Sequence, residues 1–238
     1  MNAAEEKRRI RENVWRILEE KGYARPPLPV RGRIPNFLGA EAAAAKLVST
    51  DEFRNARVVK VSPDSPQRPV REACLRMGKT LITPSPRIRH GFYLLDPDEI
   101  GGRGISHAAT IRGMFSLGRQ VEPESLGRID LIVVGSVAVA RDGARVGKGE
   151  GYSELEYAIL RMLGKVGEDT PIATTVHPAQ LVWRIPVEPF DVSVDIAATT
   201  SSLKRFSSHG PRPQGILWEM LDSRKIDEIP LLRRLKSG

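Results

Sequence analysis

Short apolar runs alternate with amphipathic stretches along most of the chain. An apolar stripe with helical spacing predicts a helix over residues 4–21, and Gly22 follows it as a residue that can end a helix in a left-handed conformation. An alanine-rich stretch predicts a second helix over residues 39–48. Proline and arginine dominate residues 25–35, so this stretch is predicted to be an extended loop.

Strands are predicted where β-branched residues form short runs between turn residues. These runs fall at residues 58–61, 80–83, 92–95, 129–134, 171–176 and 192–198. Helices are predicted between strands at residues 70–77 and 153–163. The run 129–134 is apolar on both faces, which is typical of a buried parallel strand. The alternation therefore predicts an α/β fold whose mostly parallel sheet is covered by helices on both faces.

Two stretches follow a different pattern. Residues 137–140 and 144–146 flank Asp142-Gly143, a dipeptide that favours a tight hairpin. Residues 101–118 carry five glycines, which interrupt any periodicity and leave the stretch without a predicted element.

The ends of the chain are predicted to be helical. Residues 214–235 read as two short amphipathic helices within a carboxyl-terminal helical tail over residues 203–238. Because no repeat or low-complexity linker divides the chain, we expect one domain over residues 1–238, with its first helices in residues 1–48.

Charge, the length of apolar runs and the cysteine count restrict the possible ligands and the cellular location of the protein. The 238 residues carry 37 Lys and Arg against 29 Asp and Glu, a net charge of +8, and 27 of the cations are arginine. Such an excess attracts anions without specifying nucleic acid, nucleotide or acidic metabolite. The longest apolar stretch, residues 131–140, is half of the roughly 20 residues that span a membrane. The lone Cys74 cannot form an internal disulfide, so we expect a cytoplasmic protein without a signal peptide.

The most specific local signal is the run Arg145-Val-Gly-Lys-Gly-Glu-Gly-Tyr152. Its alternate glycines lie between a predicted hairpin and a predicted helix. Glycine lets the backbone approach a ligand, and successive N–H groups at a helix start can face an anion. Arg145 and Lys148 would add charge-assisted contacts to phosphate oxygens. We therefore predict phosphate binding. The alternative is a surface turn, since the spacing matches neither of the common nucleotide-binding glycine motifs.

Two carboxylates accompany this loop. Glu154 lies in the first turn of the predicted helix after the loop, and Asp191 precedes a predicted strand. Mg²⁺ bound with a nucleotide usually takes one or two carboxylates and completes its shell with phosphates and water. The alternative makes Glu154 a helix-end charge and Asp191 a turn residue.

Together these motifs resemble the 5-formyltetrahydrofolate cyclo-ligase family, also called methenyltetrahydrofolate synthetase. Its Arg-Leu-Gly-x-Gly-x-Gly-Tyr-Tyr-Asp signature corresponds to residues 145–154, and Ile-Pro-x-Glu-x-His-Asp to residues 185–191. An Asp leading an apolar strand corresponds to residues 130–134, and an amino-terminal Lys-x-x-apolar-Arg motif to residues 7–11. The four motifs occur in the family's order.

The resemblance implies one Rossmann-like, three-layer α/β domain similar to the sugar-phosphate isomerase and CoA-transferase folds. It also implies the ATP- and Mg²⁺-dependent conversion of 5-formyltetrahydrofolate, with or without a polyglutamate tail, to 5,10-methenyltetrahydrofolate. The reaction releases ADP and phosphate.

The resemblance also implies roles for individual residues. ATP would be bound by Lys7, Arg11, Arg145, Gly147, Lys148, Gly149, Gly151 and Tyr152. The folate substrate would contact Lys148, Gly149, Glu150, Gly151 and Tyr152. Mg²⁺ would be held by Glu154 and Asp191, and catalysis would use Arg145, Lys148 and Tyr152.

This chain departs from the family pattern at several positions. Ser153 replaces the second tyrosine, Glu154 replaces aspartate, Phe190 replaces histidine, and residues 63–69 lack the family's folate-contacting glutamate. The pattern predicts a divergent member. The alternative is a non-catalytic nucleotide- or RNA-binding relative that uses the surplus arginines, although Trp183 is expected in the core rather than on a base-stacking surface. A sugar-phosphate isomerase or CoA transferase is suggested by fold alone.

Overall fold

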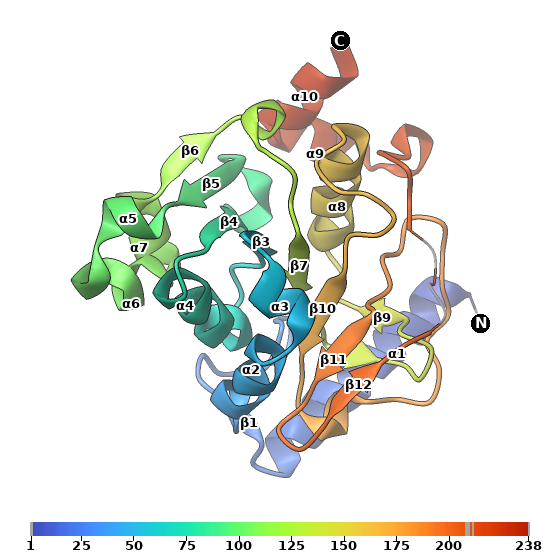
Figure 1. Ribbon diagram of the computed structural model, residues 1–238. Coiled ribbons are helices and arrows are strands. Elements are labelled where there is room, and N and C mark those ends of the chain that lie inside the picture. Colours follow the sequence, from blue (N-terminus) through green and yellow to red (C-terminus); the bar gives the residue numbers. More distant parts are fainter. Residues whose placement is uncertain (1, 208–209, 211, 238) are drawn as a thin grey trace.

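A computed structural model describes residues 2–207, 210 and 212–237 (Figure 1). Its centre is an eight-stranded sheet with the order β12-β11-β10-β7-β3-β4-β5-β6. The parallel strands are β3 (Val58–Val61), β4 (Thr80–Pro84), β7 (Leu131–Val134), β10 (Ile172–Thr175) and β11 (Ile196–Ala198). Antiparallel strands complete both edges: β5 (Phe92–Leu95), β6 (Arg119–Val121) and β12 (Leu203–Arg205). The predicted mostly parallel α/β sheet is therefore confirmed.

Both faces of the sheet are buried, and strand β7 shows how. Leu131 and Val133 enter one apolar cluster, while Ile132 and Val134 enter the cluster on the opposite face. Successive side chains of a strand point to opposite faces, so a strand buried on both sides must be apolar throughout. This explains the uninterrupted apolar run that the sequence shows there.

Helices cover the two faces unequally. One face packs against α2 (Ala40–Val48), α3 (Asp51–Asn55), α4 (Arg68–Arg76), α6 (Ile105–Ala108) and α7 (Ile111–Leu117). The other face packs against α8 (Tyr152–Met162) and α10 (Pro230–Ser237). The short helix α5 (Pro97–Ile100) follows β5. Figure 1 shows α2 and α4 on one side of the central strands and α8 on the other.

Helix α1 (Ala3–Glu20) packs against the hairpin of β8 (Ala138–Val139) and β9 (Arg145–Val146). Its buried Val14, Trp15 and Leu18 share one apolar cluster with the hairpin's Ala138 and Val146. The helix begins at Asn2, whose side-chain oxygen accepts the Glu5 N–H at 2.9 Å. A two-stranded ribbon of β1 (Ala24–Arg25) and β2 (Asn36–Phe37) follows it. The hairpin predicted around Asp142-Gly143 is confirmed.

Several predicted bounds need correction. Only residues 196–198 of the predicted strand 192–198 pair in the sheet, because Val192 and Val194 are buried outside its ladder. Residues 101–118, left without a prediction, contain α6 and α7. The predicted tail over 203–238 begins with the edge strand β12, so it is not helical throughout.

The rest of the tail follows the prediction. It contains a 3-10 turn at Trp218–Met220 and the helices α9 (Ser223–Glu228) and α10. Ile229 and Leu232 are buried in the cluster beneath α8. Tail residues 208–209, 211 and 238, and residue 1 at the other end, lie outside the described residues.

Trp183 contradicts its prediction, because 72% of its surface is exposed. The Arg141 guanidinium lies over its indole ring, 3.7 Å from the ring centre. No helix within residues 2–207, 210 and 212–237 is apolar over enough length to cross a membrane.

A buried ion pair joins the sheet to α8. The Lys60 ammonium on β3 contacts a carboxylate oxygen of Glu156, and both side chains are almost fully enclosed. Burial raises the pKa of Glu156, while the charge of Lys60 acts in the opposite direction. Removing one partner of such a pair leaves an uncompensated buried charge, whereas removing both does not.

We therefore expect Lys60→Met alone to lower the free energy of unfolding by about 3–5 kcal/mol. The double variant Lys60→Met/Glu156→Leu should recover most of that loss. Urea unfolding of the wild type, both single variants and the double variant measures the coupling. Additive losses in the double variant would contradict the pairing.

Candidate functional site

The glycine loop, residues 147–151, lies between β9 and the start of α8 at the carboxyl edge of the sheet. Gly149 and Gly151 have φ of 101° and 71°, in the left-handed region that side chains other than glycine rarely adopt. A Cβ on Gly149 would also lie 3.4 Å from the Arg11 guanidinium carbon. The loop therefore requires glycine at these positions for its conformation, and Arg11 of α1 lies within van der Waals contact of Gly149.

Arg145 is buried where the loop begins. Its Nε donates to the Val192 carbonyl at 3.1 Å, and its Nη1 donates to the Gly135 carbonyl at 3.1 Å. Its Nη2 pairs with Oε1 of Glu154 in the first turn of α8. Only 2% of the residue is exposed. Its guanidinium therefore links three parts of the fold: the end of β7, the start of α8, and the segment that precedes β11. The predicted direct contact of Arg145 with phosphate stays a prediction.

Lys7 of α1 is also buried, in an ion pair with two carboxylates. Its ammonium lies 2.7 Å from Glu188 and 2.5 Å from Oδ2 of Asp191. The same Asp191 oxygen accepts the backbone N–H of Glu188 at 2.7 Å. The ammonium also lies 5.2 Å from the centre of the Phe190 ring. These contacts fix the loop around Asp191 against α1.

Arg11 connects these two ion pairs to the glycine loop. Its Nε donates to the Gly147 carbonyl at 2.7 Å. Burial lowers the pKa of the Arg11 guanidinium, and the negative charges of Glu154 and Asp191 oppose that shift. Arg145 joins Glu154 to the carbonyl of Val192, the residue after Asp191, so both predicted metal ligands lie near Arg145 at the start of the glycine loop, and their role as ligands stays a prediction.

Glu154 and Asp191 would offer two carboxylates to a metal ion. Among the described residues, no group of three or more His, Cys, Asp or Glu is arranged to hold a metal. Arg145 engages Oε1 of Glu154, and Lys7 engages Oδ2 of Asp191. Two carboxylates are nevertheless the protein ligands that Mg²⁺ needs when nucleotide phosphates supply the rest of its shell. The donor chemistry therefore fits Mg²⁺ that arrives with a nucleotide.

A polar cavity of about 500 Å³ opens on the glycine loop. Lys148, Glu150 and Tyr152 of the predicted substrate set line it, and Lys148 pairs with Glu150 at 2.6 Å. Arg87 lines it from the loop after β4 and lies 3.0 Å from Glu150. Arg87 has φ of 58°, a backbone conformation that is uncommon for a residue with a side chain.

Asp64, which also lines the cavity, was missed in the sequence. It lies just after β3, where loops at the carboxyl ends of parallel strands form binding sites. Burial raises the pKa of its carboxyl, and the charges of Lys148, Arg71 and Lys60 oppose this. The signal in the sequence was an acidic residue directly after a buried parallel strand. Residues 63–69 contain this aspartate and no glutamate.

Comparisons with known proteins place this geometry in context. The sequence model described as the 5-formyltetrahydrofolate cyclo-ligase family matches residues 3–200. A methenyltetrahydrofolate synthase domain-containing protein of Danio rerio is 38% identical over 242 residues, which cover 100% of this chain and 63% of that protein. The protein of the same name from Mus musculus is 40% identical over 235 residues, covering 97% of this chain and 63% of that protein. The chain thus spans about three fifths of the length of these relatives.

A solved structure has the same fold. The NMR structure of 5,10-methenyltetrahydrofolate synthetase from Aquifex aeolicus has a TM-score of 0.53 and 22% sequence identity to this chain. The match covers 88% of this chain and 95% of that one.

The Lys7 pair gives a pH-dependent prediction. Burial raises the pKa of Asp191 above its ordinary value of 3.8, and Lys7 opposes that rise. We therefore expect Lys7→Met to raise the pKa of Asp191 further. A carboxyl with a raised folded pKa contributes stability that is fully present below its unfolded pKa and is lost as pH rises through the folded pKa. Lys7→Met should therefore lower the free energy of unfolding by about 3–5 kcal/mol at pH 7 and clearly less at pH 5.

Urea unfolding at both pH values measures this effect. Arg16→Met is the control, because Arg16 forms an ion pair with Glu20 on the same helix with 57% of each side chain exposed. It should cost no more than about 0.5 kcal/mol at either pH. Equal losses for the two variants would contradict the buried pair.

Proposed function

The chain belongs to the 5-formyltetrahydrofolate cyclo-ligase family, and on that premise we propose that it uses ATP and Mg²⁺ to convert 5-formyltetrahydrofolate to 5,10-methenyltetrahydrofolate. The observation that carries the proposal is the contact network at the glycine loop, in which Arg11 donates to the Gly147 carbonyl and Arg145 joins Glu154 to the segment that follows Asp191. Cations, backbone N–H groups and carboxylates are thereby combined at one helix start, as a metal-bound polyphosphate requires.

ATP phosphates are proposed to lie along residues 147–151. The amino-terminal end of α8 and its preceding N–H groups favour negative charge there. Arg11 and Lys148 would neutralise phosphate oxygens, and Lys7 would keep Asp191 in place. Mg²⁺ held by Glu154 and Asp191 would withdraw charge from the phosphoryl oxygens. Arg145 is proposed to act by orienting Glu154.

The folate is proposed to occupy the polar cavity of about 500 Å³. Its cationic lining residues Arg31, Arg33 and Arg87 suit the carboxylates of a folate glutamate tail. Asp64 can pair with the N–H groups of a pteridine ring. Tyr152 and Lys148 line the cavity where the loop meets it, so the formyl group would face the terminal phosphate across Lys148.

The proposed chemistry proceeds in two displacements. The formyl oxygen attacks the γ-phosphorus, and the bond from that phosphorus to the oxygen of ADP breaks. The N10 nitrogen then bonds to the formyl carbon and loses its proton, and the carbon–oxygen bond to phosphate breaks. No side-chain nucleophile takes part, so the protein would act by positioning and by charge neutralisation at the phosphoryl group.

Purified protein mixed with 5-formyltetrahydrofolate and MgATP should form ADP and the methenyl product, whose absorbance reports the reaction. Lys148→Ala should reduce kcat/KM by about 100-fold or more, because it removes a positive charge beside the reacting phosphate. Lys204→Ala on the exposed edge strand β12 is the matched control and should leave the rate unchanged. Absence of both products from wild-type protein would contradict the proposed reaction.

One observation favours RNA binding as a second candidate. We propose that a base of a single strand would stack on the exposed Trp183 ring, over which the Arg141 guanidinium lies. A hollow along α1 has an excess of positive charge, since it is lined by Arg8, Arg9, Arg16 and Arg31 together with Glu12 and Glu19. If the reaction fails, RNA binding that weakens with salt and with Trp183→Ala would support this candidate.

A further inference from the structure

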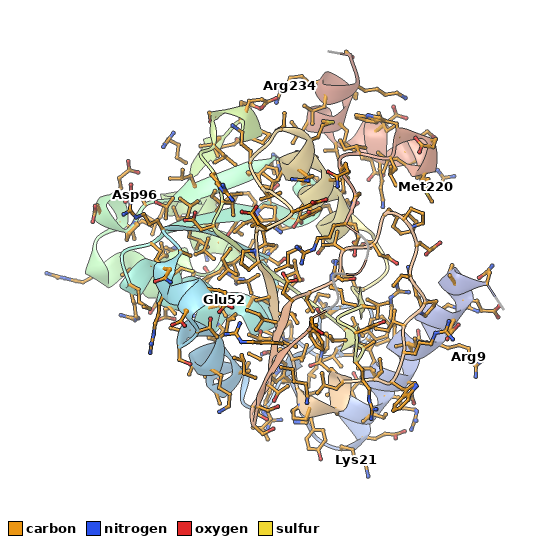
Figure 2. All side chains as sticks on the ribbon, turned by 45° about the vertical axis from the view of Figure 1, so that its right-hand side comes forward. Arg9, Lys21, Glu52, Asp96, Met220 and Arg234 are labelled. Atoms are coloured by element: carbon orange, nitrogen blue, oxygen red, sulfur yellow. The ribbon has the colours of Figure 1, made fainter. Side chains whose placement is uncertain are left out.

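A smaller and mostly apolar hollow of about 260 Å³ adjoins the glycine loop. Residues Gly149–Gly151, Glu154, Leu155 and Ala158 form one wall, and Phe190 lies beside them. The other wall comes from the carboxyl-terminal segment, residues 212–237, through Ile216, Leu221 and neighbouring residues. Figure 1 shows α9 of this segment beside α8, and Figure 2 shows Met220, which also lines the hollow, on the side of the molecule opposite to Asp96.

The carboxyl-terminal segment is anchored to the glycine loop. The Lys225 ammonium donates to the Glu150 carbonyl and lies 5.2 Å from the centre of the Tyr152 ring. A Cβ on Gly151 would lie 3.1 Å from this ammonium. Lys225 thus places a positive charge on the loop that is proposed to bind phosphates.

The segment is also fixed at both ends. Arg212 pairs with Asp195 at 2.6 Å before the hollow, and Ile229 and Leu232 are buried in the core after it. The wall of the hollow is therefore part of the packed structure. The family's sequence model ends at residue 200, whereas the Danio rerio relative matches the whole chain, so this wall lies beyond the family-matched region.

We propose that this hollow binds the base of the nucleotide whose phosphates lie on the glycine loop. The inference rests on the proposed nucleotide site. A flat heterocyclic base has two apolar faces and a polar edge. Its faces suit the apolar walls that Leu155, Phe190 and Leu221 provide. Its polar edge suits the polar side chains of Asp222 and Lys225, which also line the hollow. The polar cavity instead carries the charges that suit a folate. Lys225 is a positioning residue that holds the loop between base and phosphates.

The experiment separates the base from the phosphates. Isothermal titration of the full chain compares MgATP with magnesium tripolyphosphate, which has the phosphate chain and lacks the base. Wild-type protein should bind ATP at least about tenfold more tightly, because only ATP buries apolar surface in the hollow. Leu221→Ala should weaken ATP binding about fivefold and tripolyphosphate binding less than twofold.

Leu235→Ala is the matched control. Leu235 lies in the same segment and packs against the same core cluster as Leu221, but it does not line the hollow. It should leave both affinities unchanged. If Leu221→Ala does not fold, Met220→Ala replaces it, since Met220 lines the hollow and is 48% exposed.

The outcomes are distinguishable. Equal affinity of the wild type for ATP and tripolyphosphate would overturn the base site and leave the phosphate site standing. An equal loss of both ligands in Leu221→Ala would also overturn it, because the loop and not the base would then be affected. Weaker binding of 5-formyltetrahydrofolate with unchanged ATP binding would assign the hollow to the folate ring. Binding of neither ATP nor tripolyphosphate to the wild type would overturn the proposed function together with this inference.

Discussion

The buried contact between the Lys7 ammonium and Asp191 is the interaction on which the rest of the site depends. It joins residues separated by 184 positions and brings α1 against the segment before β11. The same helix thereby presents Arg11 to the Gly147 carbonyl. Arg11 is thus the cation that α1 places against the glycine loop.

Charge at the loop is balanced within a network, in which the cations Lys7, Arg11 and Arg145 lie among the carboxylates of Glu154, Glu188 and Asp191. Glu154 forms an ion pair with Arg145, and Asp191 forms one with Lys7. The negative charges of both carboxylates also act on the Arg11 guanidinium and raise its pKa against the effect of burial. Buried charges are tolerated when each has a partner, and removal of one partner is costly. This balance accounts for a basic protein having a site with closely placed carboxylates.

Periodicity and turn chemistry predict much of the fold. The buried strand β7, helices α1 and α8 and the hairpin before the glycine loop all follow from local sequence. The errors arise where tertiary contacts decide. Val192 and Val194 have the pattern of a strand, yet they are buried beside the sheet, and the Val192 carbonyl accepts from Arg145 instead of a neighbouring strand. Trp183 has no local signal that distinguishes a stacked surface position from a core position.

The candidate site divides in the same way. The glycine loop and its two carboxylates are readable from the sequence because residue type and spacing define them. The ion-pair partners of those carboxylates, and the wall that the carboxyl-terminal segment adds, depend on contacts between distant parts of the chain. Asp64 is intermediate: its position after the buried strand β3 can be predicted from the sequence, whereas its place in the wall of the polar cavity depends on the fold.

A crystal structure of the protein with a non-hydrolysable MgATP analogue tests the central claim most directly. The account predicts phosphate oxygens within hydrogen-bond distance of the N–H groups of residues 148–151 and of Arg11, with Mg²⁺ bound by Glu154 and Asp191. Phosphates bound elsewhere, or Mg²⁺ without either carboxylate, would contradict it.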